Sequence, residues 1–156
     1  EMGVDEALEA FATDPAIVDR LESLSRVGLG YLPLGQPLST LSGGEHQRIR
    51  LAQALSGEAT NRLYVLDEPT TGLHPADIRV LLGALDALVE SGGTVVVVEH
   101  NLEVVRHADF VIDLGPEGGP GGGQLMAAGS PEEISMDPRS HTGEALRLQR
   151  EGALSG

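Results

Sequence analysis

Two apolar runs of this sequence end in side chains that suit phosphate chemistry. Asp67 and Glu68 follow residues 63–66, and His100 comes shortly after residues 94–98. If both runs are parallel strands, these side chains lie at the carboxyl edge of a sheet, where open α/β folds bind ligands. Because side chains alternate along an extended segment, Asp67 suits a Mg²⁺ ligand, whereas Glu68 suits a base that polarises an attacking water. His100 at the same edge is placed to donate a hydrogen bond to a phosphate.

A glycine pair opens a predicted helix upstream of these runs and allows two interpretations. As a capping box, Ser42 accepts a bond from the Glu45 amide, and the Glu45 side chain reaches back. Gly43 and Gly44, however, occupy the first turn, where glycine lowers helix propensity. Without side chains they let a large anion approach backbone N–H groups at the positive end of the helix dipole. The second interpretation, beside a purely structural cap, is therefore a phosphate site.

Each motif taken alone also has an ordinary explanation. Asp67 and Glu68 would be loop carboxylates, and His100 would be a surface histidine, as His46, His107 and His141 are expected to be. The common placement of the motifs at helix and strand ends favours a single site. A glycine-rich segment such as residues 115–123 can cradle a phosphate, but here no lysine and no clear helix start follow it. These residues are therefore predicted to be a turn between strands.

Apolar periodicity and turn residues place these motifs in an α/β chain. The runs 63–66 and 94–98 are apolar at successive positions, which predicts strands that are buried on both faces. The order of the central elements favours parallel pairing of these strands through a helix. Short capped elements are expected after them, with a capping box at Ser130. The expected helices cover residues 4–11, 16–26, 42–55, 75–92, 101–105, a segment after 130 and 142–150, and the expected strands cover 63–66, 94–98, 110–112 and 124–128.

Composition excludes several classes of site and partner. The net charge of the 156 residues is -14, which opposes binding of a nucleic-acid backbone by this segment alone. All basic residues are arginine, so the chain cannot contain a phosphate loop of the form G-x-x-x-x-G-K-[ST]. The absence of cysteine excludes disulfides and cysteine-ligated zinc. No apolar run is long enough to cross a bilayer and no secretory signal opens the chain, so we expect a cytoplasmic location.

Taken together, the motifs resemble those of ABC ATPases. Residues 41–48 are similar to the signature motif, 63–68 to Walker B with its catalytic glutamate, 70–74 to the D-loop, and His100 to the switch histidine. Within that superfamily the chain resembles the C-terminal nucleotide-binding domain of UvrA, the damage-sensing component of the ABC excinuclease. The stretches that carry this resemblance are 30–37, 67–74, 99–102 and 113–119. His46 departs from the pattern, since the UvrA signature more often has a small residue there.

The resemblance implies an α/β fold, namely a partial ABC-type P-loop NTPase domain. It would combine the signature helical part with the parallel-sheet half that carries Walker B, and it would lack the strand that leads into the phosphate loop. The resemblance also implies three segments. These are a helical segment leading to the signature at 1–40, the C-terminal half of the ATPase domain at 41–135, and a tail helix at 136–156.

The resemblance also assigns roles to single residues. In ABC ATPases two nucleotide sites form by opposition of two halves. Ser42, Gly43 and Gly44 would then complete a site whose phosphate loop belongs to another half, with Glu45, Gln47 and Gly72 as further nucleotide contacts. Asp67 would contact the nucleotide through Mg²⁺, and Glu68 and His100 would be catalytic. ATP and Mg²⁺ are the implied cofactors, and the family's cysteine-ligated zinc module would lie upstream.

The activity that the resemblance implies is ATP-dependent recognition of DNA damage in nucleotide excision repair. The expected partners are an upstream or second ATPase half that supplies the phosphate loop, DNA, a UvrB-like repair protein and a second copy of the full-length form, with no membrane. Without the lysine-bearing loop, we expect this chain alone not to hydrolyse ATP. A UvrA-like ATPase for self-resistance to DNA-binding drugs would carry the same motifs. A non-catalytic fragment that pairs with a partner half is also compatible with them, whereas residues 70–74 fit a transporter ATPase less well.

Overall fold

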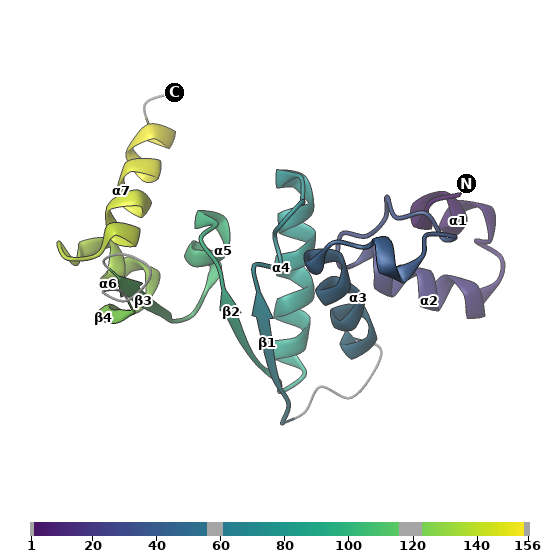
Figure 1. The fold of residues 1–156 in the computed structure, drawn as a ribbon, viewed down its shortest axis with the longest axis horizontal. Coiled ribbons are helices and arrows are strands. Elements are labelled where there is room, and N and C mark those ends of the chain that lie inside the picture. Colours follow the sequence, from purple (N-terminus) through teal and green to yellow (C-terminus); the bar gives the residue numbers. More distant parts are fainter. Residues whose placement is uncertain (1, 56–60, 116–122, 155–156) are drawn as a thin grey trace. The chain divides into compact units, whose positions relative to one another are not determined.

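The computed structural model describes residues 2–55, 61–115 and 123–154. The chain divides into two compact units, Glu1–Glu99 and His100–Gly156 (Figure 1). Within the described residues, no helix combines the length and apolar character that crossing a bilayer would need. The three segments expected at 1–40, 41–135 and 136–156 describe the distribution of motifs and stay a prediction.

The described residues of the first unit, 2–55 and 61–99, form five helical segments and two strands, most of which the sequence predicts to within two residues. Their bounds are α1 Val4–Ala10, α2 Pro15–Ser25, the 3-10 helix η1 Leu38–Thr40, α3 Gly43–Leu55, β1 Leu63–Asp67, α4 Pro75–Glu90 and β2 Thr94–Val98. Local caps explain where two helices begin, because Asp14 accepts from the Ala16 amide at 3.1 Å and His74 accepts from the Ala76 amide at 3.3 Å. Proline follows each cap as the first helical residue. The short η1 helix was not predicted.

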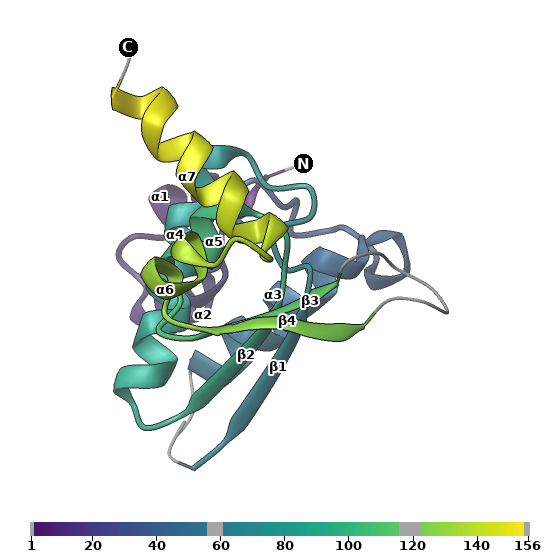
Figure 2. The same ribbon diagram turned by 90° about the vertical axis from the view of Figure 1, so that its left-hand side faces the viewer.

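Strands β1 and β2 pair in parallel, as predicted, with α4 as the crossover (Figures 1 and 2). Asp67 is the register partner of Val98, so both strands end at the same edge. The prediction that both faces of these strands are buried is wrong for the described chain. Tyr64, Leu66, Val95 and Val97 pack toward the core, where α4 contacts β2. The opposite face stays exposed, and its apolar members are Leu63, Val65, Val96 and Val98.

The core of the first unit joins the helical segments to the strands. Leu81 and Leu88 of α4 are 0% and 1% exposed, and both belong to this core. Leu51 of α3 and Leu66 of β1 lie in the same cluster. The start of α3 and the end of β1, which carry the predicted site residues, therefore belong to one packed body.

In the second unit, the residues that the structure describes form an antiparallel pair of strands and three helices, at bounds close to those predicted. They are α5 Leu102–His107, β3 Val111–Gly115, β4 Gln124–Gly129, α6 Pro131–Met136 and α7 His141–Leu154. Figure 2 shows β3 and β4 side by side, and they pair with an irregularity between Asp113 and Leu114. Val105, Ala127, Ile134 and Leu146 form the core. The glycine-rich turn predicted between the strands lies, from 116 to 122, outside the described residues.

Capping bonds set the helices of the second unit, as the sequence predicts. Asn101 accepts from the Glu103 amide at 2.9 Å, and the Ser130 hydroxyl accepts from the Glu133 amide at 3.3 Å. The Glu133 carboxylate accepts from the Ser130 amide at 2.8 Å, which completes the capping box.

Candidate functional site

The start of α3 forms the capping box that the sequence allows. The Ser42 amide donates to Glu45 Oε2 at 2.6 Å, and the Glu45 amide donates to Ser42 Oγ at 3.2 Å. The bond from the Ser42 amide is the main cause that lowers the pKa of the Glu45 carboxyl below its usual range. Ser42 and Gly43 are nevertheless exposed. The first N–H groups of a helix have no acceptor within the helix, so this end retains the features of an anion site.

The two glycines of this turn have different surroundings. A Cβ on Gly43 would meet no atom within 4 Å, whereas a Cβ on Gly44 would lie 3.0 Å from the Thr71 carbonyl oxygen and 3.2 Å from Arg48 Nη1. Gly44 is buried. The sequence explains both glycines by the approach of an anion, but the structure explains Gly44 by close packing of α3 against the loop that follows Glu68. Gly43 alone keeps open space beside it.

This difference predicts opposite effects of one substitution at neighbouring positions. Gly43→Ala adds a methyl group in open space and improves helix propensity, so we expect it to be neutral or to stabilise by up to about 1 kcal/mol. Gly44→Ala forces the Thr71 backbone or the Arg48 side chain to move, and we expect it to destabilise by about 1 kcal/mol or more. Urea unfolding of the two variants, followed by circular dichroism, measures the difference. Equal stabilities would contradict the packing explanation.

Asp67 and Glu68 lie at the end of β1, as predicted, and both side chains are exposed. The Asp67 amide donates to Gln47 Oε1 of α3 at 3.0 Å, and the Glu68 amide donates to the Val98 carbonyl of β2 at 2.8 Å. The side chain of Gln47 thus ties α3 to the end of β1. A contact of Gln47 with a nucleotide stays a prediction.

Glu68 has a backbone conformation that side chains rarely adopt. Its φ is 46°, in the left-handed region. Such a conformation costs about 1–3 kcal/mol and persists when the surrounding structure holds it, often at functional sites. The bonds from the Glu68 amide to Val98 and from the Thr71 amide to the Glu68 carbonyl, at 3.1 Å, hold it here. The Thr71 hydroxyl, 3.5 Å from Glu68 Oε2, lies beside its carboxylate.

The remaining predicted residues follow β1 or β2 along the chain. A Cβ on Gly72 would have open space beside it, but the φ of this residue is 76°. The backbone conformation of the turn, rather than packing, therefore favours glycine here. His74 is the N-cap of α4. His100 is exposed and is the first residue of the second unit, directly after Glu99. Its action on the same phosphate as Glu68 stays a prediction.

Comparison with known proteins gives the same family as the motifs. The family described as ABC transporter matches residues 5–71, which include the start of α3 and all of β1. UvrABC system protein A of Brucella abortus biovar 1 (strain 9-941) is 58% identical over 148 residues, which are 94% of this chain and 15% of that protein. The protein of the same name from Aquifex aeolicus (strain VF5) is also 58% identical over 148 residues, 94% of this chain and 16% of that protein. The chain belongs to the UvrA family.

A solved structure supports the same assignment at the level of the fold. The crystal structure of UvrA2 from Deinococcus radiodurans matches with a TM-score of 0.82 and 50% identity, over 94% of this chain and 18% of that one. The predicted α/β ABC ATPase fold is thereby confirmed. This UvrA-family chain spans about a sixth of the length of the curated relatives that it matches.

Arg48 lies beside the predicted site, and the motif comparison assigns it no role. Its exposed fraction is 0%, although it is charged, and its Nη1 donates to the Pro69 carbonyl at 2.8 Å. The sequence contains a signal for it. Position 48 lies on the same helical stripe as the buried Gly44, Leu51 and Ala52, at the spacing of a core face. An arginine on such a stripe indicates a buried polar contact.

The donor set at this strand end fits Mg²⁺ only together with a bound nucleotide. In the part of the chain that the structure describes, no three His, Cys, Asp or Glu side chains gather as a metal cluster. Mg²⁺ is commonly held by one or two carboxylates and by substrate phosphates rather than by a cage of protein ligands. The exposed Asp67 carboxylate meets that requirement.

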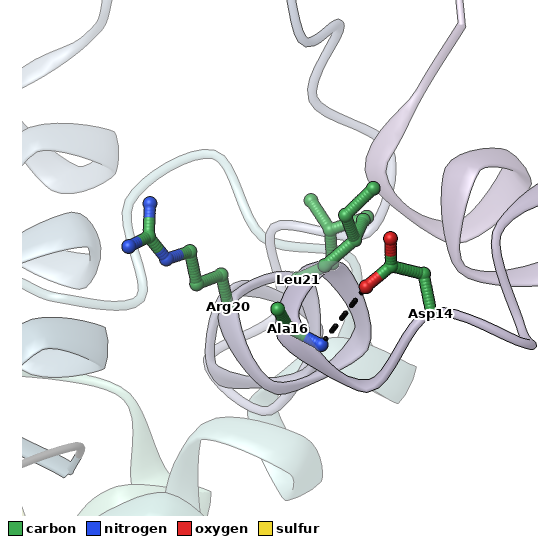
Figure 3. A pocket seen from close by; sticks show the side chains of 5 residues that line it. Asp14, Ala16, Arg20 and Leu21 are labelled. Carbon is green, nitrogen blue, oxygen red and sulfur yellow. Dashed lines mark hydrogen bonds between the residues drawn. The ribbon is translucent and has the colours of Figure 1, made fainter.

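A shallow pocket lies along α2 of the first unit (Figure 3). Asp14, Ala16, Ile17, Arg20 and Leu21 line it. The Asp14 carboxylate is engaged with the Ala16 amide, as the dashed line in Figure 3 shows. None of the predicted nucleotide residues lines this pocket.

Proposed function

We propose that this chain supplies the signature helix and the catalytic carboxylates of a UvrA-type ATPase that uses ATP in the recognition of damaged DNA. The observation that carries the proposal is the bond from the Asp67 amide to Gln47, at 3.0 Å. It joins the helix that begins with the exposed Ser42 and Gly43 to the strand that ends in two exposed carboxylates. Two kinds of group that we propose to act on phosphate thus belong to one compact unit.

The roles of these residues follow from their chemistry. Ser42 and the amides of Gly43 and Gly44 are proposed to bind phosphate oxygens at the positive end of α3. Glu45 maintains that turn through the capping box, and Gln47 holds α3 beside the end of β1. Both residues are therefore proposed to support nucleotide contacts at the turn. Glu68 is proposed to accept a proton from the attacking water or to orient it.

Asp67 and His100 complete the proposed assignment. Asp67 would hold Mg²⁺, which when bound neutralises charge on the β- and γ-phosphates of ATP. His100 is proposed to donate a hydrogen bond near the γ-phosphate, and Gly72 to let the turn after Glu68 approach the nucleotide. No lysine occurs in the chain, so a phosphate loop with its lysine must come from another part of the protein or from a second copy of the complete protein.

The partners proposed for the whole protein follow from the family. They are DNA, a second ATPase half, a UvrB-like repair protein and a second copy in a homodimer. A net charge of -14 opposes the approach of a polyphosphate backbone, so we place the DNA-binding surface outside this chain. The zinc module of the family is likewise assigned to other residues, because this chain has no cysteine.

The test compares the chain with the complete protein encoded by its gene. We expect the purified 156-residue chain to show no ATP hydrolysis above background, and the complete protein to hydrolyse ATP at a rate that DNA changes. Addition of a second ATPase half that carries a phosphate loop should restore activity to the chain. Hydrolysis by the chain alone that depends on Glu68 would refute the proposed division of the site. A complete protein without ATPase activity would favour a non-catalytic pairing role.

Preference for damaged over intact DNA tests the repair assignment separately from the ATPase assignment. We expect damaged duplexes to shift the ATPase rate more than intact duplexes of the same sequence. An ATPase rate that rises with a DNA-binding drug, but does not respond to damaged DNA, would instead support the self-resistance function.

A further inference from the structure

Arg48 is a buried cation, and the hydrogen bonds from its Nη1 go to one loop. Its Nη1 donates to the carbonyl oxygens of Pro69 and Thr71, at 2.8 and 3.3 Å. Both carbonyls belong to residues 68–74, the β1–α4 loop, which begins with Glu68. Arg48 Nε is buried without a hydrogen-bond partner in the described part of the chain. A buried charge with an unsatisfied donor is costly, and a well-packed apolar side chain often serves stability equally well.

The same guanidinium also reaches the start of α3 through a tyrosine. Arg48 Nη2 donates to the Tyr31 hydroxyl oxygen at 3.4 Å, and that hydroxyl donates to Glu45 Oε1 at 2.8 Å. Partial burial and the bond to Glu45 raise the pKa of Tyr31, so the phenol stays a donor at neutral pH. Glu45 in turn holds the Ser42 amide. A continuous set of hydrogen bonds therefore runs from the helix start to the β1–α4 loop.

A second side chain holds the loop at the residue between the two carbonyls. Glu99, which follows β2, accepts from the Thr70 amide at 2.9 Å and from the Thr70 hydroxyl at 2.5 Å. The loop is thus bound on one side by α3 and on the other by the end of β2. Such bracing explains how Glu68, at the head of the loop, keeps its left-handed conformation.

We propose that Arg48 is a positioning residue, which holds the β1–α4 loop against the start of α3 so that the Glu68 carboxylate and the Ser42 turn keep one fixed arrangement. The inference deepens the proposed function and rests on it, because Glu68 and Ser42 are the residues assigned to ATP. Arg48 itself is fully buried, so it is placed to act through the loop rather than on the nucleotide. Its removal should therefore affect the chemical step more than the binding of ATP.

Hydrogen exchange in the full chain tests the contact without any measurement of activity. The amides of Thr71 and Leu73 are suitable reporters, since they donate within the loop to Glu68 and Thr70. In Arg48→Met, which retains much of the side-chain volume, we expect both amides to exchange about tenfold faster or more. The Ser91 amide, bonded to Ala87 at the far end of α4, should not change. Unchanged exchange at Thr71 and Leu73 would overturn the proposal.

Kinetics of the complete protein test the positioning role. For Arg48→Met we expect kcat to fall about tenfold or more while KM for ATP stays within about twofold, the pattern of an interaction that matters in the transition state. Arg48→Lys should recover part of the loss, because an ammonium group can reach one carbonyl but lacks the planar fork of guanidinium. Arg50→Met, an exposed change on the same helix, is the matched control and should behave as the unchanged protein.

The outcomes separate this inference from the function on which it rests. If the unchanged complete protein has no ATPase activity, the proposed function fails, and the exchange experiment still decides whether Arg48 holds the loop. If kcat per folded molecule is unchanged in Arg48→Met, the side chain is purely structural and the positioning role is refuted. If Arg48→Met does not fold, Arg48→Lys replaces it, and full protection of the Thr71 and Leu73 amides in that variant would refute the proposal.

Discussion

Glu68→Gln in the complete protein is expected to lower kcat for ATP hydrolysis by about 10²- to 10⁴-fold, the usual contribution of a positioned general base. The amide is nearly isosteric with the carboxylate but cannot accept the proton of the attacking water. Because Glu68 is exposed and its backbone, rather than its side chain, is bonded to Val98, the fold should not change. ATP binding should be retained or become tighter. Steady-state kinetics and binding of a fluorescent ATP analogue measure the two effects separately.

Glu90→Gln is the matched control for this change. Glu90 is an exposed acid at the end of α4, outside the predicted site, and the same substitution there should leave kcat unaltered. A Glu68→Gln protein that retains more than about a tenth of the original kcat would exclude Glu68 as the general base. An unchanged kcat together with a raised KM for ATP would point to a binding role instead.

Leu81→Ala is expected to lower the free energy of unfolding by about 2–5 kcal/mol, the range for a large aliphatic side chain removed from a packed core. Leu81 is 0% exposed and lies in the cluster that joins α4 to the other elements of the first unit. Since most domains are stable by only about 5–15 kcal/mol, a loss of this size should be evident as a lower midpoint of urea unfolding. Circular dichroism of the full chain is a sufficient measurement.

Val80→Ala tests whether this effect comes from burial. Val80 precedes Leu81 on α4 and is 42% exposed, so its truncation should change the stability by no more than about 0.5 kcal/mol. Equal losses in the two variants would show that α4 does not pack through Leu81. A large loss for Val80→Ala alone would mean that the exposed face of α4 is covered in solution.

The start of α3 illustrates how far a motif can be interpreted without coordinates. The residue pattern at Ser42 and Glu45 predicts a capping box, and the two reciprocal bonds are present. It cannot distinguish Gly43 from Gly44, because the atom that makes Gly44 necessary is the carbonyl oxygen of Thr71, far along the chain. The helical stripe indicates that Arg48 is buried but not what it contacts, since its acceptors are the distant carbonyls of Pro69 and Thr71.

The strands show a comparable division between local and distant causes. Runs of apolar residues predict β1 and β2 and their parallel pairing, which is found. The runs also predict burial on both faces, yet Val65 is 65% exposed and Val96 is 46% exposed. Whether a strand face is covered depends on which helices pack against it, and in the first unit the core lies on the face of Leu66.

The sequence by itself determined most of the helices and strands, several of their caps and the family to which the chain belongs, whereas the chemistry of the motifs stays a prediction. These features depend on residues within a few positions of one another, where propensity, capping and periodicity act. Only the tertiary structure decided that Gly44 packs against Thr71, that Arg48 donates to the carbonyls of Pro69 and Thr71, and that Glu68 adopts a left-handed conformation. Each of these depends on atoms that the fold brings together from distant positions, and no local pattern specifies such contacts.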